Sequence, residues 1–226
     1  FDARPKTLRQ ECEESLRRLN TEYVDLYYLH APDPNVPVTE SAGALKHLLE
    51  SGKVRSIGVS NFNVGQLSAF HAICPISAVQ PAYNMLQREI EADIVPWCLG
   101  HQASVVVYWP LLKGLLAGKL TRHHQFGAGD GRPKYSMFQG EEWNKNHDFL
   151  DELRTIADQV GKTVAQLVVA WTVRQPGITA ALCGAKRACQ IEETAGALGW
   201  TLDDETLGLI DQALGRRGQP ASQSAV

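Results

Sequence analysis

The sequence has no marked excess of one charge and no long hydrophobic run. Its 226 residues include 22 Lys and Arg against 25 Asp and Glu, which gives a formal net charge of −3. This balance gives no indication of a surface for nucleic acid or for an anionic membrane. No stretch is apolar over the length that a membrane span requires, and no signal-peptide pattern opens the chain. We therefore expect no nucleic-acid partner and no membrane partner.

Cysteine and histidine patterns that form disulfides or metal sites are also missing. The five cysteines are odd in number and scattered, and they contain no CxxC pair. His123 and His124 are adjacent, so their side chains point apart and cannot chelate one ion without other ligands. No metal-ligand spacing connects the other histidines considered, which are His47, His71, His101 and His147. We expect no metal, and we expect reduced thiols of the kind found in a cytoplasmic protein.

The glycine motifs of common nucleotide-binding folds are absent as well. No GxGxxG lies at a strand–helix turn, where a Rossmann dinucleotide site would need it. Gly114–Leu120 resembles a phosphate loop, but it is one residue short, and Leu120 stands where Ser or Thr must reach Mg²⁺. The glycines of Gly127–Gly131 follow no strand, so a flexible turn explains them better.

The most informative stretch is Tyr23–Pro34. Residues Tyr23–Leu29 are aromatic, aliphatic or β-branched apart from one aspartate, which predicts a buried strand. His30 follows at once, and two prolines prevent further strand pairing beyond it. Because α/β barrels carry their catalytic groups at the carboxyl ends of strands, His30 is a candidate catalytic residue. A histidine that only caps the strand end is the alternative.

Strand and helix signals alternate along the chain. Strands are expected at Tyr23–Leu29, Lys53–Asn61, Ile76–Gln80, Ser104–Tyr108 and Ile178–Leu182. Helices are expected at Lys6–Leu19, Val38–Ser51, Val64–Ile73, Ile90–Leu99, Asp148–Val160, Thr163–Val173, Ala188–Leu198 and Asp203–Leu214. Thr39 and Thr201 are the expected N-caps of two of these helices, and Gly52 is an expected C′ glycine. Lys113–Asn146 carries few signals of either kind, and the tail 215–226 is predicted to be disordered.

This alternation predicts an α/β fold with a parallel sheet and helices outside it, in one domain over residues 1–214. Five strands fit an open doubly wound sheet, whereas a closed (β/α)₈ barrel needs eight strands and about 250 residues. Two features favour the barrel. No Rossmann motif is present, and the first four strands each end in residues with useful chemistry, namely His30, Ser60–Asn61, Gln80 and Tyr108.

Six segments, found in order along the chain, resemble the aldo-keto reductases. They are SLRRLNTEYVDLYYLHAPDP, ESGKVRSIGVSNF, VQPAYNML, VYWPLLKGLLAGKL, GDGR and GAKRACQIEETAGALGW. The resemblance covers nearly the whole chain from Ser15 to Leu214. It implies a (β/α)₈ TIM-type barrel that binds NADP(H) extended across its carboxyl face without a Rossmann fold. It also implies an oxidoreductase that reduces small aldehydes and ketones to alcohols.

The resemblance assigns roles to the residues at the strand ends. His30 would orient and polarise the substrate carbonyl, because an imidazole N–H near a developing alkoxide gains strength as charge builds. Ser60, Asn61 and Gln80 would hold the nicotinamide carboxamide, whose donor and acceptor Asn and Gln side chains complement. Tyr108 would stack on the nicotinamide ring, although a core aromatic is the alternative.

Further roles follow for the later loops. Trp109 would shape the substrate pocket, and a basic residue opposite the 2′-phosphate, best matched by Lys186 with Arg187 beside it, would favour NADPH over NADH. The loop expected to wrap the diphosphate contributes Pro110, Leu111, Lys113, Gly114, Leu115 and Lys119. The segment expected at the adenosine end contributes Gly184, Ala185, Lys186, Gln190, Glu193 and Thr194. Thr194 departs from the family, which usually has Asn there.

The front of the chain departs most from the family. The family's catalytic tetrad is Asp, Tyr, Lys and His, and nothing in Phe1–Pro5 matches the first three. By the family's pattern the chain holds strands four to eight, and it begins with Phe rather than Met. The sequence therefore predicts a fragment that is inactive alone, because hydride transfer would lack its acid. The alternative is a non-catalytic, nucleotide-binding regulatory subunit of the same fold, like the β-subunits of channels.

Overall fold

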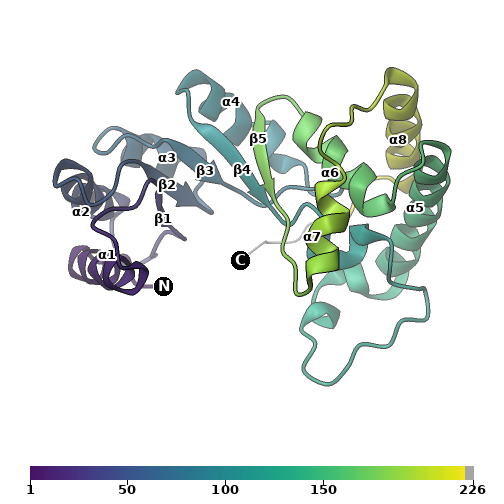
Figure 1. Cartoon of the computed structure of the whole chain (residues 1–226), viewed down its shortest axis with the longest axis horizontal. Helices are drawn as coiled ribbons and strands as arrows, with labels where there is room; N and C mark the ends of the chain where they lie inside the picture. Colours follow the sequence, from purple (N-terminus) through teal and green to yellow (C-terminus); the bar gives the residue numbers. More distant parts are fainter. Residues whose placement is uncertain (222–226) are drawn as a thin grey trace. The chain divides into compact units, whose positions relative to one another are not determined.

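The computed structural model describes residues 1–221, which divide into two compact units (Figure 1). The first unit contains residues 1–81 and 89–106, and the second contains residues 82–88 and the chain from residue 107 onward. Strand β4 (Ser104–Tyr108) crosses the boundary between the two units along the sequence. The candidate residues before and after β4 therefore belong to different units.

Parallel strands form the interior of the first unit. They are β1 (Tyr27–Leu29), β2 (Ile57–Ser60), β3 (Ala78–Gln80) and the first residues of β4, paired in that order. All four residues of β2 are buried, as expected for a strand that is covered on both faces. The register places Leu29, Val59 and Val79 side by side, so the residues after these strands emerge at one edge of the sheet.

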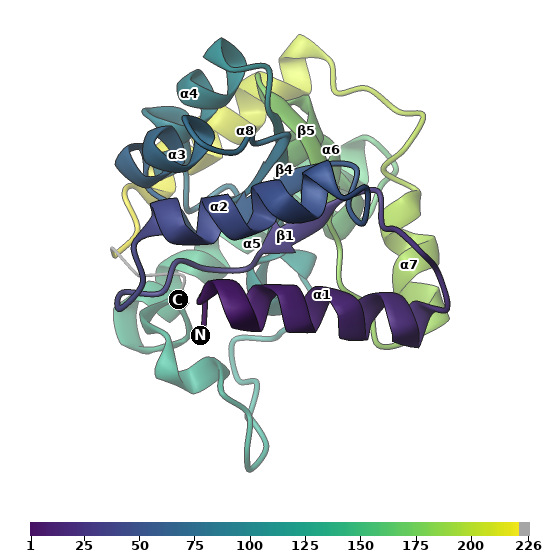
Figure 2. The same cartoon turned by 90° about the vertical axis from the view of Figure 1, so that its left-hand side faces the viewer.

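Helices cover the sheet of the first unit. They are α1 (Pro5–Leu19), α2 (Val38–Glu50), α3 (Val64–His71), the 3₁₀ turn η1 (Glu89–Glu91) and α4 (Ile94–Gly100). Helix α1 buries Leu8, Cys12 and Leu16, which recur every four residues and so share one face. Helices α1 and α2 lie side by side (Figure 2).

A close contact inside this sheet requires glycine at position 58. Gly58 of β2 lies against the ring of Tyr28 on β1, and a Cβ at this position would overlap ring carbons of Tyr28. A larger residue would therefore push the Tyr28 ring out of its place.

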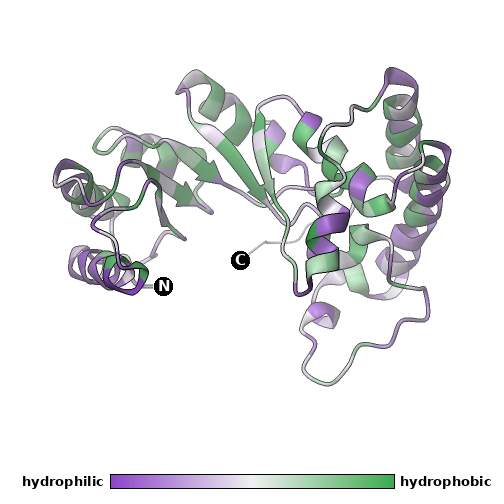
Figure 3. Cartoon of the chain, in the orientation of Figure 1, coloured by the Kyte–Doolittle hydropathy of each residue, from purple (hydrophilic) through white to green (hydrophobic). Residues whose placement is uncertain are grey.

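The second unit is mostly helical. Its elements are η2 (Leu112–Ala117), η3 (Arg132–Lys134), η4 (Ser136–Phe138), α5 (Gly140–Gln159), α6 (Val164–Arg174), β5 (Ile178–Leu182), α7 (Ala188–Ala195) and α8 (Asp204–Arg217). In the sheet, β5 is the neighbour of β4. Tyr83 stacks on Trp171 of α6 with 6.0 Å between the ring centroids, and both side chains are fully buried. Strand β4 is coloured hydrophobic in Figure 3, whereas α5 shows many hydrophilic residues.

A buried arginine fastens α8 to α5 in the second unit. Arg217, the last residue of α8, donates to Asn146 Oδ1 from two nitrogens at 3.1 and 2.8 Å, and it pairs with Glu142. Asn146 in turn donates to the carbonyl of Met137, 2.9 Å away. Buried polar groups need such partners to offset the loss of water.

Most predicted elements are confirmed, but their bounds differ. The strand predicted at Lys53–Asn61 is regular only at Ile57–Ser60, and Ser104–Tyr108 and Ile178–Leu182 occur as predicted. Helix α5 begins at Gly140, eight residues before the predicted Asp148. The single helix predicted at Ile90–Leu99 is instead η1 and α4, which Asp93 separates by capping α4.

The expected caps and the expected tail also need correction. Pro37 rather than Thr39 is the N-cap of α2, and Asp203 rather than Thr201 is the N-cap of α8, where its carboxylate accepts from the amide of Thr206. Gly52, with φ of +74°, follows the end of α2 as predicted. Helix α8 continues to Arg217, so the prediction of disorder from Gly215 was wrong for its first residues; the end of the predicted tail, 222–226, lies outside the described residues.

Over residues 1–221, no helix combines the length and the apolar character that crossing a bilayer would require. The same residues contain no group of three or more His, Cys, Asp or Glu side chains arranged to hold a metal ion.

Candidate functional site

Four predicted site residues meet at the carboxyl ends of the first unit's strands. Asn61 Nδ2 donates to the backbone carbonyl of His30 and to Ser60 Oγ, each at 3.1 Å. Ser60 Oγ donates to the backbone carbonyl of Gln80 at 2.7 Å, and Ser60 is 1% exposed. These hydrogen bonds connect the ends of β1, β2 and β3, as the sequence predicted for residues at one edge of a parallel sheet.

The backbone at this edge is strained. Asn61 has φ of +61°, a left-handed conformation that few residues other than glycine adopt and that asparagine tolerates best. Its amide nevertheless donates to the end of the neighbouring strand β1, at His30, and to Ser60 at the end of its own strand. His30 is exposed, and its ring lies edge-on to Phe1 with 5.7 Å between the centroids. The imidazole of His30 is therefore open to an incoming molecule.

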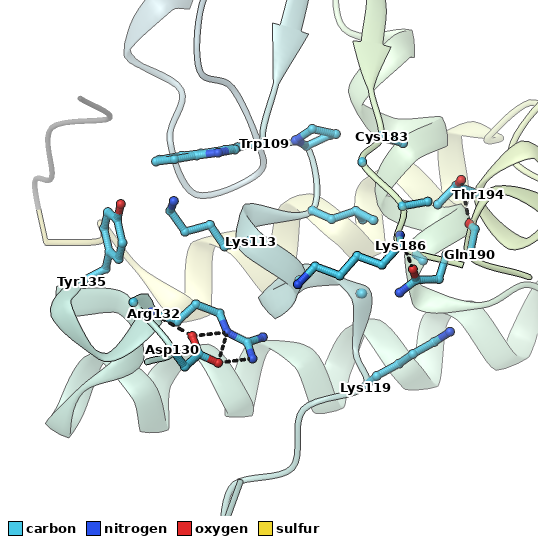
Figure 4. Close-up of a pocket in the computed structure, with 18 of the residues that line it drawn as sticks. Trp109, Lys113, Lys119, Asp130, Arg132, Tyr135, Cys183, Lys186, Gln190 and Thr194 are labelled. Atoms are coloured by element: carbon cyan, nitrogen blue, oxygen red, sulfur yellow. Dashed lines mark hydrogen bonds and ion pairs between the residues drawn. The ribbon is translucent and has the colours of Figure 1, made fainter. Parts of the chain in front are cut away.

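The second unit contains a large cleft, with a volume of about 1330 Å³ (Figure 4). This exceeds the roughly 300–1,000 Å³ of an ordinary small-molecule pocket. Its walls come from the segment after β4, from the loop before α5, and from the segment that joins β5 to α7. Of the predicted site residues it gathers Trp109, Pro110, Leu111, Lys113, Gly114, Lys119, Gly184, Ala185, Lys186, Gln190, Glu193 and Thr194.

The cleft has an excess of positive charge. Two of its cations are paired within the cleft, Lys119 with Glu193 and Arg132 with Asp130 at 2.6 Å. The hydrogen bonds from Arg132 lower the pKa of Asp130 to about 2, so this carboxylate stays ionised. The remaining cleft lysines have no carboxylate partner in the described part of the chain, and they are Lys113, Lys134 and Lys186. The cleft therefore offers uncompensated positive charge to an anionic ligand.

One end of the cleft is aromatic. The ammonium of Lys113 lies 3.7 Å from the ring centroid of Trp109 and 4.3 Å from that of Tyr135. The two rings are perpendicular, with 6.0 Å between their centroids, and Trp109 also meets Tyr108 edge-on at 5.3 Å. Trp109, Leu112 and Lys113 have positive φ angles of 60°, 44° and 53°. Strain of this kind concentrates at binding sites.

The other end of the cleft is the turn between β5 and α7. Gln190 Oε1 accepts from the backbone amides of Lys186 and Arg187 at 2.7 and 3.1 Å, and Thr194 Oγ1 donates to the carbonyl of Gln190 at 2.9 Å. These side chains therefore shape the turn as well as line the cleft. The Lys186 side chain extends across the cleft (Figure 4).

The loop before α5 is fastened at its base. Arg122 bonds Asp148 at 2.6 Å and Asp151 at 2.8 Å, and its carbonyl accepts from Trp143 Nε1 at 2.9 Å. Arg154 donates to the carbonyl of Gly118 at 2.9 Å. The chain between Gly118 and Arg122 is thereby held against α5.

Two of the site residues predicted in the second unit are not part of the cleft wall. Leu115 is fully buried in the core, so it belongs to the packing of the second unit. Tyr108 adjoins the wall through Trp109. Sequence reasoning gave no role to other residues of the wall, notably Asp130, Arg132, Lys134, Tyr135 and Cys183. The motif GDGR, which contains Asp130 and Arg132, was the signal that pointed to this loop.

The model of the aldo/keto reductase family matches residues 1–214. The chain belongs to this family. It is 39% identical over 197 residues to aldo-keto reductase YhdN of Bacillus subtilis (strain 168), covering 87% of this chain and 60% of that protein. It is 32% identical over 231 residues to a Schizosaccharomyces pombe (strain 972 / ATCC 24843) aldo-keto reductase, yakc, whose name specifies NADP(+), covering 98% of this chain and 68% of the relative.

Comparison with solved structures agrees with this family assignment. The glycerol dehydrogenase AKR11B4 from Gluconobacter oxydans superposes with a TM-score of 0.92 at 37% identity, over 100% of this chain and 68% of that one. The predicted α/β class with a parallel sheet is confirmed, and the chain matches a barrel protein of an oxidoreductase family. The chain spans about three fifths of the length of the Bacillus relative.

Proposed function

We propose that the protein is an NADP(H)-dependent reductase of aldehydes and ketones, with the cleft of the second unit as its cofactor site. The observation that carries this proposal is the uncompensated positive charge of the cleft, where Lys134 and Lys186 lack a carboxylate partner over residues 1–221. A dinucleotide with a diphosphate and a 2′-phosphate is the ligand that this charge and this volume would suit. The name of the yeast relative, which specifies NADP(+), supports the same cofactor.

The two ends of the cleft would bind different parts of the cofactor. Lys186, with Arg187 beside it, would meet the 2′-phosphate, because both are exposed at the turn before α7 and neither has a carboxylate partner within residues 1–221. Arg132 and Lys119, which also line the cleft, would stay near the diphosphate. Tyr108 would support the nicotinamide, which supplies the hydride when the cofactor is bound.

The strand ends of the first unit would handle the carbonyl. The imidazole of His30 is exposed, while the carbonyl of His30 is held by Asn61. A histidine N–H directed at a carbonyl oxygen polarises it and stabilises the negative charge that develops during hydride transfer. Ser60, Asn61 and Gln80 would bind the carboxamide, in agreement with their position at the same edge.

The cofactor assignment is tested by measuring NADPH and NADH dissociation constants of the intact protein by fluorescence quenching. Lys186→Ala should weaken NADPH binding about 10- to 100-fold, because a charge-assisted hydrogen bond contributes about 1.5–3 kcal/mol. NADH binding should change little. Lys145→Ala, which removes an exposed lysine from α5, is the matched control. An unchanged NADPH/NADH ratio would contradict the placement of the 2′-phosphate at Lys186.

A second measurement separates an enzyme from a binding protein. The intact protein should oxidise NADPH in the presence of simple aldehydes. Tight NADPH binding without turnover would instead favour a regulatory, nucleotide-binding subunit.

A further inference from the structure

The ammonium of Lys113 is held in an unusual place. It lies over the faces of Trp109 and Tyr135, at 3.7 and 4.3 Å from the ring centroids, and this side chain is half-buried in the wall of the cleft. Aromatic faces attract a cation, but they do not neutralise its charge. No carboxylate within residues 1–221 pairs with Lys113. The cation is thus fixed in position and still able to bind an anion.

The strained backbone at Trp109 and Lys113 indicates that their side chains have a functional role. Trp109 and Lys113 both adopt positive φ, where glycine is the least strained residue. Gly114, the next residue, has φ of +91°, so glycine does occur in this segment. A lysine and a tryptophan at such positions cost conformational energy, and their side chains face the same part of the cleft (Figure 4).

The location separates this cation from those assigned to the cofactor. Lys113 and Trp109 lie at the end of the cleft that adjoins Tyr108, whereas Lys186 and Gln190 lie at the other end (Figure 4). Under the proposed function, on which this step rests, Tyr108 marks the reacting end of the cofactor. A substrate approaching that end would meet the Lys113 ammonium and the two rings.

We propose that Lys113, held by Trp109 and Tyr135, is a substrate subsite for an anionic group, so that the preferred carbonyl compounds carry a carboxylate or a phosphate. The ammonium binds the anion, and the Trp109 and Tyr135 rings restrict it to one position. This assigns the side chain of Lys113 to the substrate, where the sequence had placed it with the cofactor diphosphate.

Steady-state kinetics of the intact protein with matched aldehydes tests the subsite. The carboxylate pair is 4-carboxybenzaldehyde against benzaldehyde, and the phosphate pair is glyceraldehyde 3-phosphate against glyceraldehyde. Lys113→Met keeps the length of the side chain and removes the charge. It should lower kcat/KM for the anionic member of at least one pair about tenfold or more, and for the neutral members by less than about twofold. Lys113→Arg should retain most of the preference, and the pair that responds more strongly identifies the anion.

Two controls separate the effect of Lys113 from a general loss of positive charge in the cleft. Lys134→Met removes a lysine from the same cleft wall, next to Tyr135 in the sequence, that makes no cation–π contact with either ring in the described part of the chain. An equal loss in Lys134→Met would overturn the assignment to Lys113. NADPH affinity measured by fluorescence should stay within about twofold in Lys113→Met, and a large loss there would show that Lys113 serves the cofactor instead.

A binding experiment gives an answer even without turnover. Benzoate and benzyl alcohol are titrated against the intact protein, with tryptophan fluorescence as the signal. The wild type should bind benzoate more tightly than benzyl alcohol, and Lys113→Met should abolish the difference. If the wild type shows no preference for either anion in kinetics or in binding, the subsite is refuted. Failure of NADPH binding with an intact benzoate preference would refute the proposed function alone.

Discussion

The guanidinium of Arg217 lies 2.5 Å from the carboxylate of Glu142, and the arginine side chain is only 1% exposed. Breaking a buried pair by removing one partner leaves the other charge buried and costs about 3–5 kcal/mol. We expect Arg217→Met to lower the free energy of unfolding by this amount in urea titrations.

Two further variants sharpen this prediction. Replacing both members of such a pair by apolar residues is often neutral, so Arg217→Met combined with Glu142→Met should recover part of the loss. The rest remains because the buried Asn146 Oδ1 still lacks its donor. Lys145→Met breaks only the exposed pair with Glu141 and should change stability by less than about 1 kcal/mol. A double variant as unstable as Arg217→Met would show that the hydrogen bonds to Asn146 or the packing of the arginine stem, not the ion pair with Glu142, hold α8 on α5.

Gly58→Ala should destabilise the first unit, because the new methyl group would overlap the ring of Tyr28. Overpacking of this kind costs about 1–3 kcal/mol. Gly43→Ala in α2 is the matched control, since a Cβ there meets nothing within 4 Å. It should be neutral or stabilise by about 0.5–1 kcal/mol. Equal effects at the two positions in thermal unfolding would contradict the contact with Tyr28.

The free energy of unfolding should decrease as the pH falls below the ordinary pKa of a histidine side chain. His147 is 1% exposed, and its Nε2 has no hydrogen-bond partner over residues 1–221. Burial lowers the pKa of His147 below 6.5, and the charges of Arg122 and Arg154 lower it further. The unfolded chain therefore takes up a proton that the folded chain rejects, so the free energy of unfolding falls as the pH drops below about 6.5.

Urea unfolding at several pH values between 5 and 8 would measure this effect. His147→Leu should flatten the profile relative to the wild type. His47→Leu, which removes a histidine at an exposed position on α2, is the matched control. Because His71, whose pKa burial also lowers, is present in every variant, the comparison isolates His147. Parallel profiles for wild type and His147→Leu would refute the assignment.

His30→Ala in the intact protein should lower kcat/KM for carbonyl substrates about 100-fold or more, in the range of a lost oxyanion donor. NADPH affinity should stay nearly unchanged, because His30 is proposed to act on the substrate oxygen. Stopped-flow kinetics and cofactor titration on the same preparation distinguish an effect on catalysis from an effect on NADPH affinity. A loss confined to cofactor affinity would contradict this role, and a loss of folded protein would favour a histidine that only caps β1.

The sequence predicted the elements that have a clear period or a clear cap. Ser104–Tyr108 and Ile178–Leu182 are regular because short apolar runs between polar segments identify buried strands. The first two turns of α5 escaped prediction because Asn146 and His147 are buried yet polar, so the helix has no apolar stripe there. The partner of Asn146 is Arg217, which is far away in the sequence.

The candidate site was predictable where a residue follows a strand. His30, Ser60 and Gln80 come together because parallel strands end at one edge. Arg132 and Tyr135 escaped prediction because they lie in a segment without a period. Only the fold brings both residues to the cleft wall and places Tyr135 against Lys113. The burial of Leu115 could not be read from its motif, since a residue inside a recognisable motif can still point into the core.

The hydrogen bonds of Gln190 have a consequence for engineering the cofactor preference. Its side-chain oxygen holds the amides of Lys186 and Arg187, so exchanging Gln190 would disturb the backbone of the whole turn. The side chain of Lys186 is exposed and takes no part in that support. If Lys186 binds the 2′-phosphate as proposed, redesign towards NADH would start at position 186 and keep 190 fixed, because Gln190 supports the backbone of the turn.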